Sequence, residues 1–350
     1  MKRILVCSAG GAAAINFVDS LRMEAEKMFI VGADCNKWHL ENSDSNVKYV
    51  VPRCNQEGYL KKLNEIIYSE KVEFVHPQSD SEVRFLSENR EKVNAKTFLP
   101  DKKTVEICQD KAKCVEILRA NNVGVPRTAC LEDLRVEEAF SRLKLEKAWV
   151  RATRGAGSRA ALPVNSAGQA QNWINYWVEF NGFKREDFMI SEFLPGREYA
   201  FQSIWKNGEI VTSQARERLE YIFGNLMPSG QTSSPSVARS VHNNQVNETA
   251  ERAVRAIDKN ASGVFCVDLK ENALGVPCVT EINSGRFFTT SNFFSKAGAN
   301  MPFTYLKLAF GQEVKDVSKY NVVPEGFYWI RVVDKYPVLL RGEQWTSKNA

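Results

Sequence analysis

The chain lacks several patterns that would assign it to a familiar class at once. Its eight cysteines include no Cys-x-x-Cys pair, so the sequence indicates neither a zinc finger nor a dithiol redox motif. It has only three histidines, and no two of them are spaced as a metal-ligand pair. No Gly-x4-Gly-Lys-Ser/Thr motif occurs, which excludes a P-loop. No apolar run reaches the ~18 residues that a membrane-spanning helix needs.

Composition and charge are those of an ordinary globular chain. Of the 350 residues, 43% are hydrophobic and 25% are charged, which suits two domains or one large domain. The net charge of +5 is spread along the chain, so neither a nucleic acid nor a membrane is expected as a partner. Residues 4–14 imitate a signal peptide, but Gly10 and Gly11 dilute this apolar start and a helical pattern follows. We therefore expect a cytoplasmic protein with free, buried cysteines.

Residues 1–104 alternate between strand and helix patterns. This alternation is typical of a parallel, doubly wound βαβ sheet of the α/β class. Gly10-Gly11 after the first strand could face an anion, and Asp34 closes the second strand as a ribose-binding acid would, although a tight turn and a surface acid explain them equally well. The turn at 78–80 could also contact a substrate. Because no Gly-x-Gly-x-x-Gly motif is complete, a nicotinamide-dependent dehydrogenase is a weak alternative. The predicted strands are 4–8, 28–34, 72–77 and 97–99, and the predicted helices are 12–27, 58–70 and 80–93.

The most informative residues lie in a predicted β-hairpin. Two short, β-branched strands, 263–270 and 276–283, flank a turn. Asp268 lies on the first strand, whereas Glu281 and Asn283 share one face of the second because side chains alternate along a strand. Two carboxylates and an amide oxygen form a hard-oxygen set that suits Mg²⁺, with Mn²⁺ as an alternative, rather than zinc or copper. Since Mg²⁺ held by few protein ligands usually also binds phosphate oxygens, the hairpin indicates a nucleoside-triphosphate site.

This Asp-x12-Glu-x-Asn pattern resembles the metal site of the ATP-grasp superfamily, and Gly285-Arg286 with the segment 295–311 resembles its carbamoyl-phosphate-synthetase branch. The resemblance implies a two-subdomain ATP-grasp core of the α+β type over residues 105–312, with a hinge near 190–196. Residues 1–104 would form the preceding βαβ domain, and 313–350 would form C-terminal strands and a tail. A single amphipathic helix is predicted over 103–121.

The resemblance also implies roles for individual residues. Lys111 and Arg151 would bind the nucleotide phosphates, and many members have Lys-Pro where this chain has Arg151-Ala152. Glu198 would bind the ribose, and Asp268, Glu281 and Asn283 would bind the metal. A glycine loop, Gly155, Gly157 and Ser158, would also bind the phosphates. A short connecting segment, Glu192, Phe193 and Leu194, would bind the adenine.

Three arginines are candidates for the acceptor end of the site. Arg216 and Arg218 share a strand face and could grip a carboxylate or phosphate of the substrate, or they could be a solvated pair on an edge strand. Arg286 is the candidate catalytic residue, because a cation there could stabilise charge on the transferred phosphoryl group. The usual Asn-Pro-Arg is Asn283-Ser-Gly-Arg286 here, one residue longer, which leaves the role of Arg286 open.

The resemblance implies an ATP- and Mg²⁺-dependent carboxylate–amine ligase. A carboxylate would be activated as an acyl phosphate and attacked by an amine or ammonia, with release of ADP and phosphate. Two alternatives stay open: carbamoyl-phosphate-type synthesis from bicarbonate and ammonia, and an ATP-binding sensor or scaffold without turnover. The expected partners are small molecules. The identity of the substrates and the oligomeric state stay open, with a homodimer as one candidate.

Overall fold

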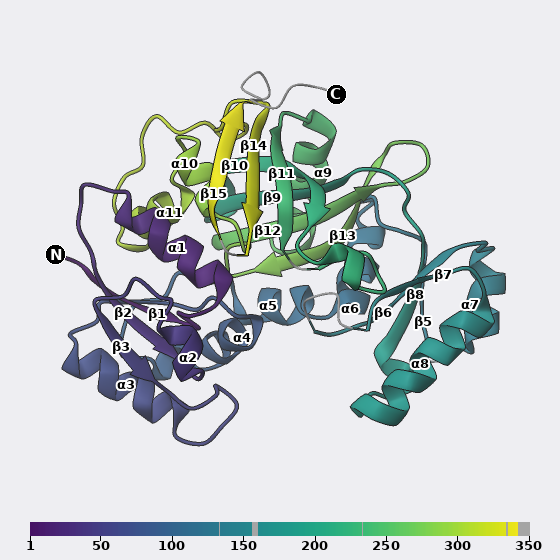
Figure 1. Ribbon diagram of the computed structural model, residues 1–350, viewed down its shortest axis with the longest axis horizontal. Helices are drawn as coiled ribbons and strands as arrows, with labels where there is room; N and C mark the ends of the chain where they lie inside the picture. Colours follow the sequence, from purple (N-terminus) through teal and green to yellow (C-terminus); the bar gives the residue numbers. More distant parts are fainter. Residues whose placement is uncertain (133, 156–159, 233, 334, 342–350) are drawn as a thin grey trace.

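The computed structural model describes residues 1–132, 134–155, 160–232, 234–333 and 335–341. Three β-sheets and the helices around them form the molecule (Figure 1). The N-terminal sheet has the strand order β3-β2-β1-β4, and its strands pair in parallel. Its elements, in chain order, are β1 (Arg3–Cys7), α1 (Ala12–Arg22), β2 (Phe29–Asp34), α2 (Lys37–Leu40), β3 (Val47–Val50), α3 (Tyr59–Ser69), β4 (Phe74–His76) and α4 (Asp80–Glu88).

The N-terminal sheet is covered on both faces, as the sequence predicts for a doubly wound fold. Ile4, Leu5, Val6 and Cys7 of β1 are all fully buried, which is the continuous apolar run expected of a parallel strand between two helical layers. Ile4 and Val6 belong to the core that α1 shares, whereas Leu5 and Cys7 belong to the core that α3 shares. The predicted α/β class of this part is therefore confirmed.

Two predictions for this part need correction. The single helix expected over 103–121 is two helices, α5 (Lys102–Cys108) and α6 (Lys111–Ala120). The break occurs because Asp110 caps the second helix, accepting a hydrogen bond from the backbone N–H of Lys113 at 3.2 Å. The strand expected at 97–99 is also wrong, because these residues form no strand and only the preceding residue, Lys96, makes an isolated bridge to Phe74.

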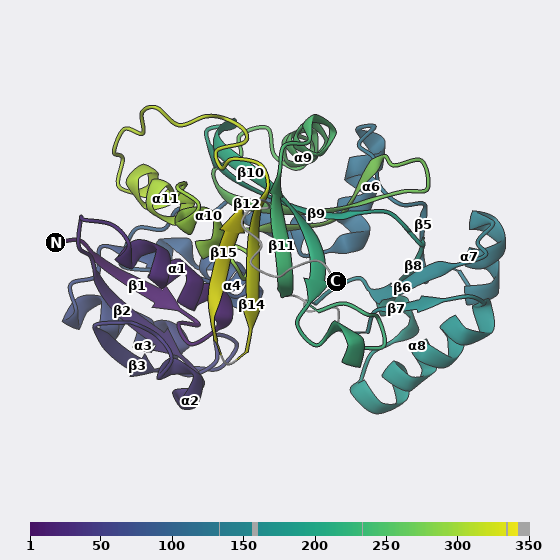
Figure 2. The same ribbon diagram turned by 45° about the horizontal axis from the view of Figure 1, so that its top comes forward.

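A small antiparallel sheet follows, with the strand order β5-β8-β6-β7. Its helices α7 and α8 lie on the outer side, away from the large sheet (Figure 2). Ala170 and Ile174 of α8 are fully buried and pack against Val150 and Ile190 of the sheet. The elements are β5 (Thr128–Cys130), α7 (Val136–Leu143), β6 (Ala148–Ala152), β7 (Leu162–Val164), α8 (Ala167–Asn181) and β8 (Phe188–Glu192).

The large sheet has seven strands in the order β13-β12-β9-β10-β11-β14-β15. One of its faces is apolar: Phe201, Phe265 and Val267 pack there against α6 and α9. Side chains alternate along each strand, so the neighbouring residues point to the opposite face. The remaining elements are β9 (Glu198–Lys206), β10 (Glu209–Tyr221), β11 (Pro235–Val241), α9 (Asn244–Ile257), β12 (Gly263–Glu271), β13 (Pro277–Ser284), α10 (Asn292–Lys296), α11 (Met301–Ala309), β14 (Phe327–Val332) and β15 (Lys335–Arg341).

The opposite face of the large sheet has two neighbours. Helices α1, α10 and α11 share a core with part of it, and the small sheet stands beside another part (Figure 2). A cavity is lined by residues of both sheets and of the segment between them, among them Trp149 of β6, Leu269 of β12 and Leu194 of the connecting segment. Among the described residues, no helix is long and apolar enough to cross a membrane.

Candidate active site

The β12–β13 hairpin lies on the wall of this cavity. Asp268 stands directly opposite Glu281, and Cys266 stands directly opposite Asn283. Directly paired residues of an antiparallel ladder share a face, so the three polar side chains point to the same side, into the cavity. A bulge lies beside Asp268, where Leu269 pairs with Val279 and Thr280 is the extra residue. Bulges of this kind redirect side chains next to active sites.

The hairpin provides a donor set that fits Mg²⁺. Asp268 and Glu281 bring two carboxylates together on adjacent strands, and Asn283 adds an amide oxygen. The described residues contain no group of three His, Cys, Asp or Glu arranged for a metal. An ion bound here would therefore take its other ligands from phosphate or water, which is the usual habit of Mg²⁺.

Asp268 is a partly buried carboxylate held by one arginine. Arg218 Nη2 donates to Asp268 Oδ1 at 2.5 Å. Burial raises the pKa of Asp268 and the nearby charge of Glu281 adds to the shift, whereas Arg218 opposes it. Burial opposes the charge on Arg218 too, but Asp268 raises the pKa of that guanidinium above its usual range. The pair places a fixed positive charge beside the candidate metal ligands.

Two cations connect the hairpin to the rest of the cavity. Lys111, at the start of α6, has its Nζ 3.5 Å from Glu281 Oε1 and donates a hydrogen bond to the carbonyl of Gly155 at 2.6 Å. Arg151, on β6 of the small sheet, donates from Nη2 to the carbonyl of Thr280 at 2.8 Å. The bulged residue thus binds an arginine of the other sheet. Both cations line the cavity where a polyphosphate would need them.

The segment that connects β8 to β9 lines the cavity between the sheets. Glu192, Phe193 and Leu194 all belong to the lining. The carboxylate of Glu192 is already bound, because Arg127 Nε donates to its Oε2 at 2.7 Å. The backbone N–H groups of Glu192 and Phe193 also have partners, the carbonyls of Arg127 and Lys147, so an adenine would bind other backbone groups of the segment.

Glu198 opens β9 and is surrounded by donors. Its carboxylate accepts hydrogen bonds from Tyr221, Gln231 and Lys270. Lys270 is its direct partner across β12 and β9, and all four residues line the cavity. An acid fixed in this way could accept hydrogen bonds from ligand hydroxyls.

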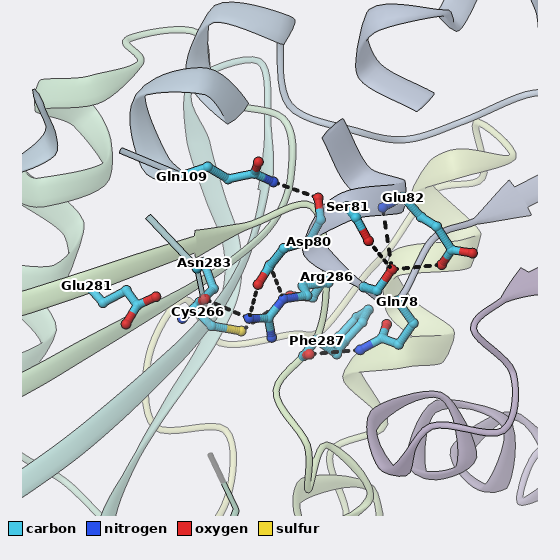
Figure 3. A network of polar contacts seen from close by, with 12 residues as sticks. Gln78, Asp80, Ser81, Glu82, Gln109, Cys266, Glu281, Asn283, Arg286 and Phe287 are labelled. Atoms are coloured by element: carbon cyan, nitrogen blue, oxygen red, sulfur yellow. Dashed lines mark hydrogen bonds and ion pairs between the residues drawn. The ribbon is translucent and has the colours of Figure 1, made fainter. Parts of the chain in front are cut away.

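Arg286 joins the hairpin to the N-terminal sheet (Figure 3). Its Nη2 donates to Asn283 Oδ1 at 2.7 Å and to Asp80 Oδ2 at 3.1 Å, and its Nε binds the other oxygen of Asp80. Burial opposes the charge on Arg286, but the Asp80 carboxylate raises the pKa of that guanidinium. Gln109 Nε2 fixes the turn further by donating to the carbonyl of Asp80 at 2.7 Å. The one-residue insertion before Arg286 therefore still leaves the guanidinium beside Asn283.

Arg216 differs from the other predicted site residues. It lies on β10 in the interior of the large sheet, not on an edge strand, and it is fully buried. Its guanidinium carbon stands 3.7 Å from the ring centre of Phe288, and this ring lines the cavity. Gly157 and Ser158 of the predicted glycine loop lie outside the described residues, whereas Gly155 lines the cavity.

The N-terminal turn is occupied by internal contacts. The backbone N–H of Gly10 donates to Asp34 Oδ2 at 2.9 Å, and the N–H of Gly11 donates to the carbonyl of Ser8 at 3.0 Å. A side chain at Gly10 would meet the backbone of His39. These contacts fit a tight turn better than an anion site, but Asp34 is not the surface acid of that alternative, because it is only 7% exposed.

Sequence reasoning missed several residues that line the cavity. Tyr221, Gln231 and Lys270 contact Glu198, and Phe288 covers Arg216. Only Lys270 carried a signal, because it follows Asp268 at strand spacing and therefore shares its face. The turn at Asp80 was noted as a candidate contact, but nothing in the sequence indicated its ion pair with Arg286.

Two family models match the chain. A family model described as ATP-grasp domain matches residues 108–291, and one described as PylC-like, N-terminal domain matches residues 4–98. The chain has no significant match among curated protein sequences.

Solved structures of similar fold cover most of the chain. The biotin carboxylase domain dimer of Hydrogenobacter thermophilus 2-oxoglutarate carboxylase, in complex with MgADP and bicarbonate, is 15% identical over 94% of this chain and 73% of its own, with a TM-score of 0.71. The ADP complex of N5-carboxyaminoimidazole synthetase from Staphylococcus aureus is 13% identical over 95% and 82%, with a TM-score of 0.73. The L-amino acid ligase from Bacillus licheniformis is 13% identical over 94% and 79%, with a TM-score of 0.70. At these identities the likeness shows the fold, and it confirms the predicted order of a parallel front sheet and a two-part core.

Proposed function

This chain belongs to the ATP-grasp family, and we propose that it is an ATP- and Mg²⁺-dependent ligase that joins a carboxylate to an amine or ammonia. The carboxylate is activated as an acyl phosphate, and ADP and phosphate are released. Three proteins of similar fold are described as a ligase, a synthetase and a carboxylase domain, which supports this reaction class.

The proposal rests on the arrangement of carboxylates and cations along one wall of the cavity. Asp268 and Glu281 face each other across two strands with Asn283 beside them, and Lys111 and Arg151 reach the same place from α6 and from the small sheet. A cation site flanked by fixed positive charges fits a metal–polyphosphate complex better than a lone metal or a lone anion.

The nucleotide would lie between the two sheets. We assign the phosphates to Lys111, Arg151 and the glycine loop that contains Gly155, Gly157 and Ser158. The adenine is assigned to the backbone of Glu192, Phe193 and Leu194, and the ribose hydroxyls are assigned to Glu198. These motifs follow one another along the chain in the order that the family resemblance implies.

Asp268, Glu281 and Asn283 are assigned to Mg²⁺, which would neutralise charge on the phosphate oxygens. A carboxylate oxygen of the substrate attacks the γ-phosphorus, and the bond from that phosphorus to the ADP oxygen breaks. The amine nitrogen then attacks the acyl carbon, the carbon–oxygen bond to phosphate breaks, and the amine loses a proton. Arg286, held between Asn283 and Asp80, is placed to stabilise charge on the transferred group. Arg216 and Arg218 are assigned to the substrate.

The test is ADP release from Mg·ATP with pooled amino acids, dipeptides, simple carboxylates and bicarbonate, with and without ammonia. The Glu281→Gln variant is the blank. Release that needs one carboxylate and one amine, and that disappears in the blank, supports the ligase. Release with bicarbonate and ammonia alone would replace it with carbamoyl-phosphate-type synthesis. Tight ATP binding without any stimulated release would indicate a sensor.

A further inference from the structure

Arg216 is a buried cation without an anion. Its exposed fraction is 0%, and none of its three guanidinium nitrogens has a hydrogen-bond partner. Phe288 stacks on the guanidinium. A ring face accepts no hydrogen bonds from the N–H groups in the guanidinium plane, so it replaces only part of the hydration that burial removes. A buried charge in this condition is strongly unfavourable unless a partner reaches it.

The register of the large sheet places Arg216 next to the candidate reaction centre. Asp268 pairs with Ala200 across β12 and β9, and Ala200 pairs with Arg216 across β9 and β10. The three residues therefore form one row on one face of the sheet. Since neighbouring strands are about 4.8 Å apart, the backbones of Asp268 and Arg216 are about 10 Å apart, with only a methyl group between them.

The neighbouring arginines on this face already have acidic partners. Arg218 is paired with Asp268, and Arg286 is paired with Asp80. Arg331 on β14 resembles Arg216 only in part, because its Nη2 is buried without a partner but its Nε donates to the carbonyl of Pro235 at 3.0 Å. Among the described arginines of this face, Arg216 is therefore the one whose whole guanidinium lacks a hydrogen-bond partner.

The segment that covers Arg216 has unused polar groups of its own. Residues 287–292 follow directly from the β12–β13 hairpin and include Phe288. The hydroxyls of Thr290 and Ser291 and the amide oxygen of Asn292 are buried without partners. Buried groups of this kind normally find a partner, so their concentration in the segment whose Phe288 covers Arg216 points to a site that a polar ligand completes.

We propose that Arg216 and the covering segment 287–292 form a closed subsite for a second carboxylate of the substrate, one that does not react. A planar guanidinium binds a carboxylate with two parallel hydrogen bonds, and Phe288 would move aside to admit it. This inference rests on the proposed ligase function and deepens it: the acceptor substrate is a small molecule with two acidic groups, whose reacting end lies over Asp268 while its other end lies at Arg216.

The test uses thermal unfolding of the full chain with malonate as the probe, in the presence of MgADP. Wild type is expected to melt at higher temperature as malonate is added. In Arg216→Met the malonate concentration for half of this shift rises about tenfold or more. Without any anion, Arg216→Met melts about 2 °C higher than wild type, because the unpaired charge is gone. Arg216→Lys keeps the charge but loses the two parallel N–H donors, so its malonate concentration for half of the shift is expected to lie between those of wild type and Arg216→Met.

Arg239→Met is the matched control, because Arg239 on β11 is paired with Glu217. It should lower the melting temperature and leave the malonate shift unchanged. An equal malonate shift in wild type and Arg216→Met overturns the subsite, as does a lower melting temperature of Arg216→Met without anion, because Arg216 is then a structural residue. A shift that depends on Arg216 with inorganic phosphate but not with malonate overturns the carboxylate assignment. A missing MgADP shift in wild type counts against the proposed function alone, since the malonate series is repeated without nucleotide.

Discussion

Two carboxylate clusters in this molecule, one buried and one partly exposed, show how similar residues acquire different roles. At the end of the N-terminal sheet, Glu82 accepts hydrogen bonds from the hydroxyls of Ser8, Tyr59 and Ser79 at 2.6, 3.1 and 3.0 Å. In the β12–β13 hairpin, Asp268 and Glu281 face each other and are contacted by cations. The first group is closed by neutral donors, whereas the second leaves oxygens on a cavity wall. Carboxylates that face each other there need a cation, and those satisfied by neutral donors do not.

The largest expected effect comes from Glu281→Gln. The change keeps the shape of the side chain but removes one of the two charges assigned to Mg²⁺. We expect ADP release to fall by about 10³-fold, equivalent to about 4 kcal/mol, while the free energy of unfolding changes little. Initial rates and urea unfolding measure the two quantities. Full activity in Glu281→Gln would show that the hairpin is not the metal site.

Glu82→Gln should have the opposite profile. An amide cannot accept from three hydroxyls as a carboxyl group does, so we expect a loss of about 2 kcal/mol in the free energy of unfolding. The turnover of the folded enzyme should not change, because Glu82 does not line the cavity. A fall in turnover without a fall in stability would show that Glu82 has a catalytic role rather than a structural one.

The pH dependence of this loss has a defined sign. Burial raises the pKa of Glu82, although its three hydroxyl partners oppose the shift. A carboxyl group with a higher pKa in the folded state binds its proton more tightly when folded. Its contribution to stability is therefore fully present below the unfolded value of about 4.5 and is lost as the pH rises through the folded pKa. Urea unfolding should show a wider gap between wild type and Glu82→Gln at pH 5 than at pH 8.

Asp80 belongs to the N-terminal part of the chain but forms an ion pair with Arg286 at the hairpin. Asp80→Asn would leave Arg286 with Asn283 as its remaining side-chain partner among those described, so the guanidinium would be less well fixed. We expect kcat to fall about tenfold with little change in KM for ATP, equivalent to about 1.4 kcal/mol. Asp80→Glu, which keeps the charge, should recover part of the rate. If both variants lose only stability, Asp80 is a structural link between the N-terminal sheet and the hairpin.

The sequence predicted the hairpin well because its signals are local. Strand patterns, a turn and side-chain alternation put Glu281 and Asn283 on one face, and pairing added Asp268. The ion pair of Asp80 with Arg286 was not predictable, because 206 positions separate the two residues and no local pattern encodes such a contact. Strand β3 was missed because it has only four residues, too few for a clear strand pattern, and none of them is buried.

Arg216 and Arg218 show the same limit within one strand. Their spacing correctly predicted a shared face, but not which of them would have a partner. The pairing register alone does not decide this, because Asp268 lies in the row of Ala200 and Arg216 but is bound by Arg218, two residues further along β10. Long-range register comes from the packing of the whole sheet and cannot be read from one strand.

The smallest effect is expected at Asp34, a buried carboxylate of the N-terminal sheet that also has only neutral donors. Asp34 accepts from the backbone N–H groups of Gly10 and Asn36 at 2.9 and 2.8 Å, and Asp34→Asn keeps only one of these acceptors. We expect a loss of about 1 kcal/mol in the free energy of unfolding and an unchanged KM for ATP and for the acceptor. Urea unfolding and steady-state kinetics give both quantities. A raised KM without a loss of stability would mean that the glycine turn binds a ligand, and the two carboxylate groups would then differ in substrate rather than in role.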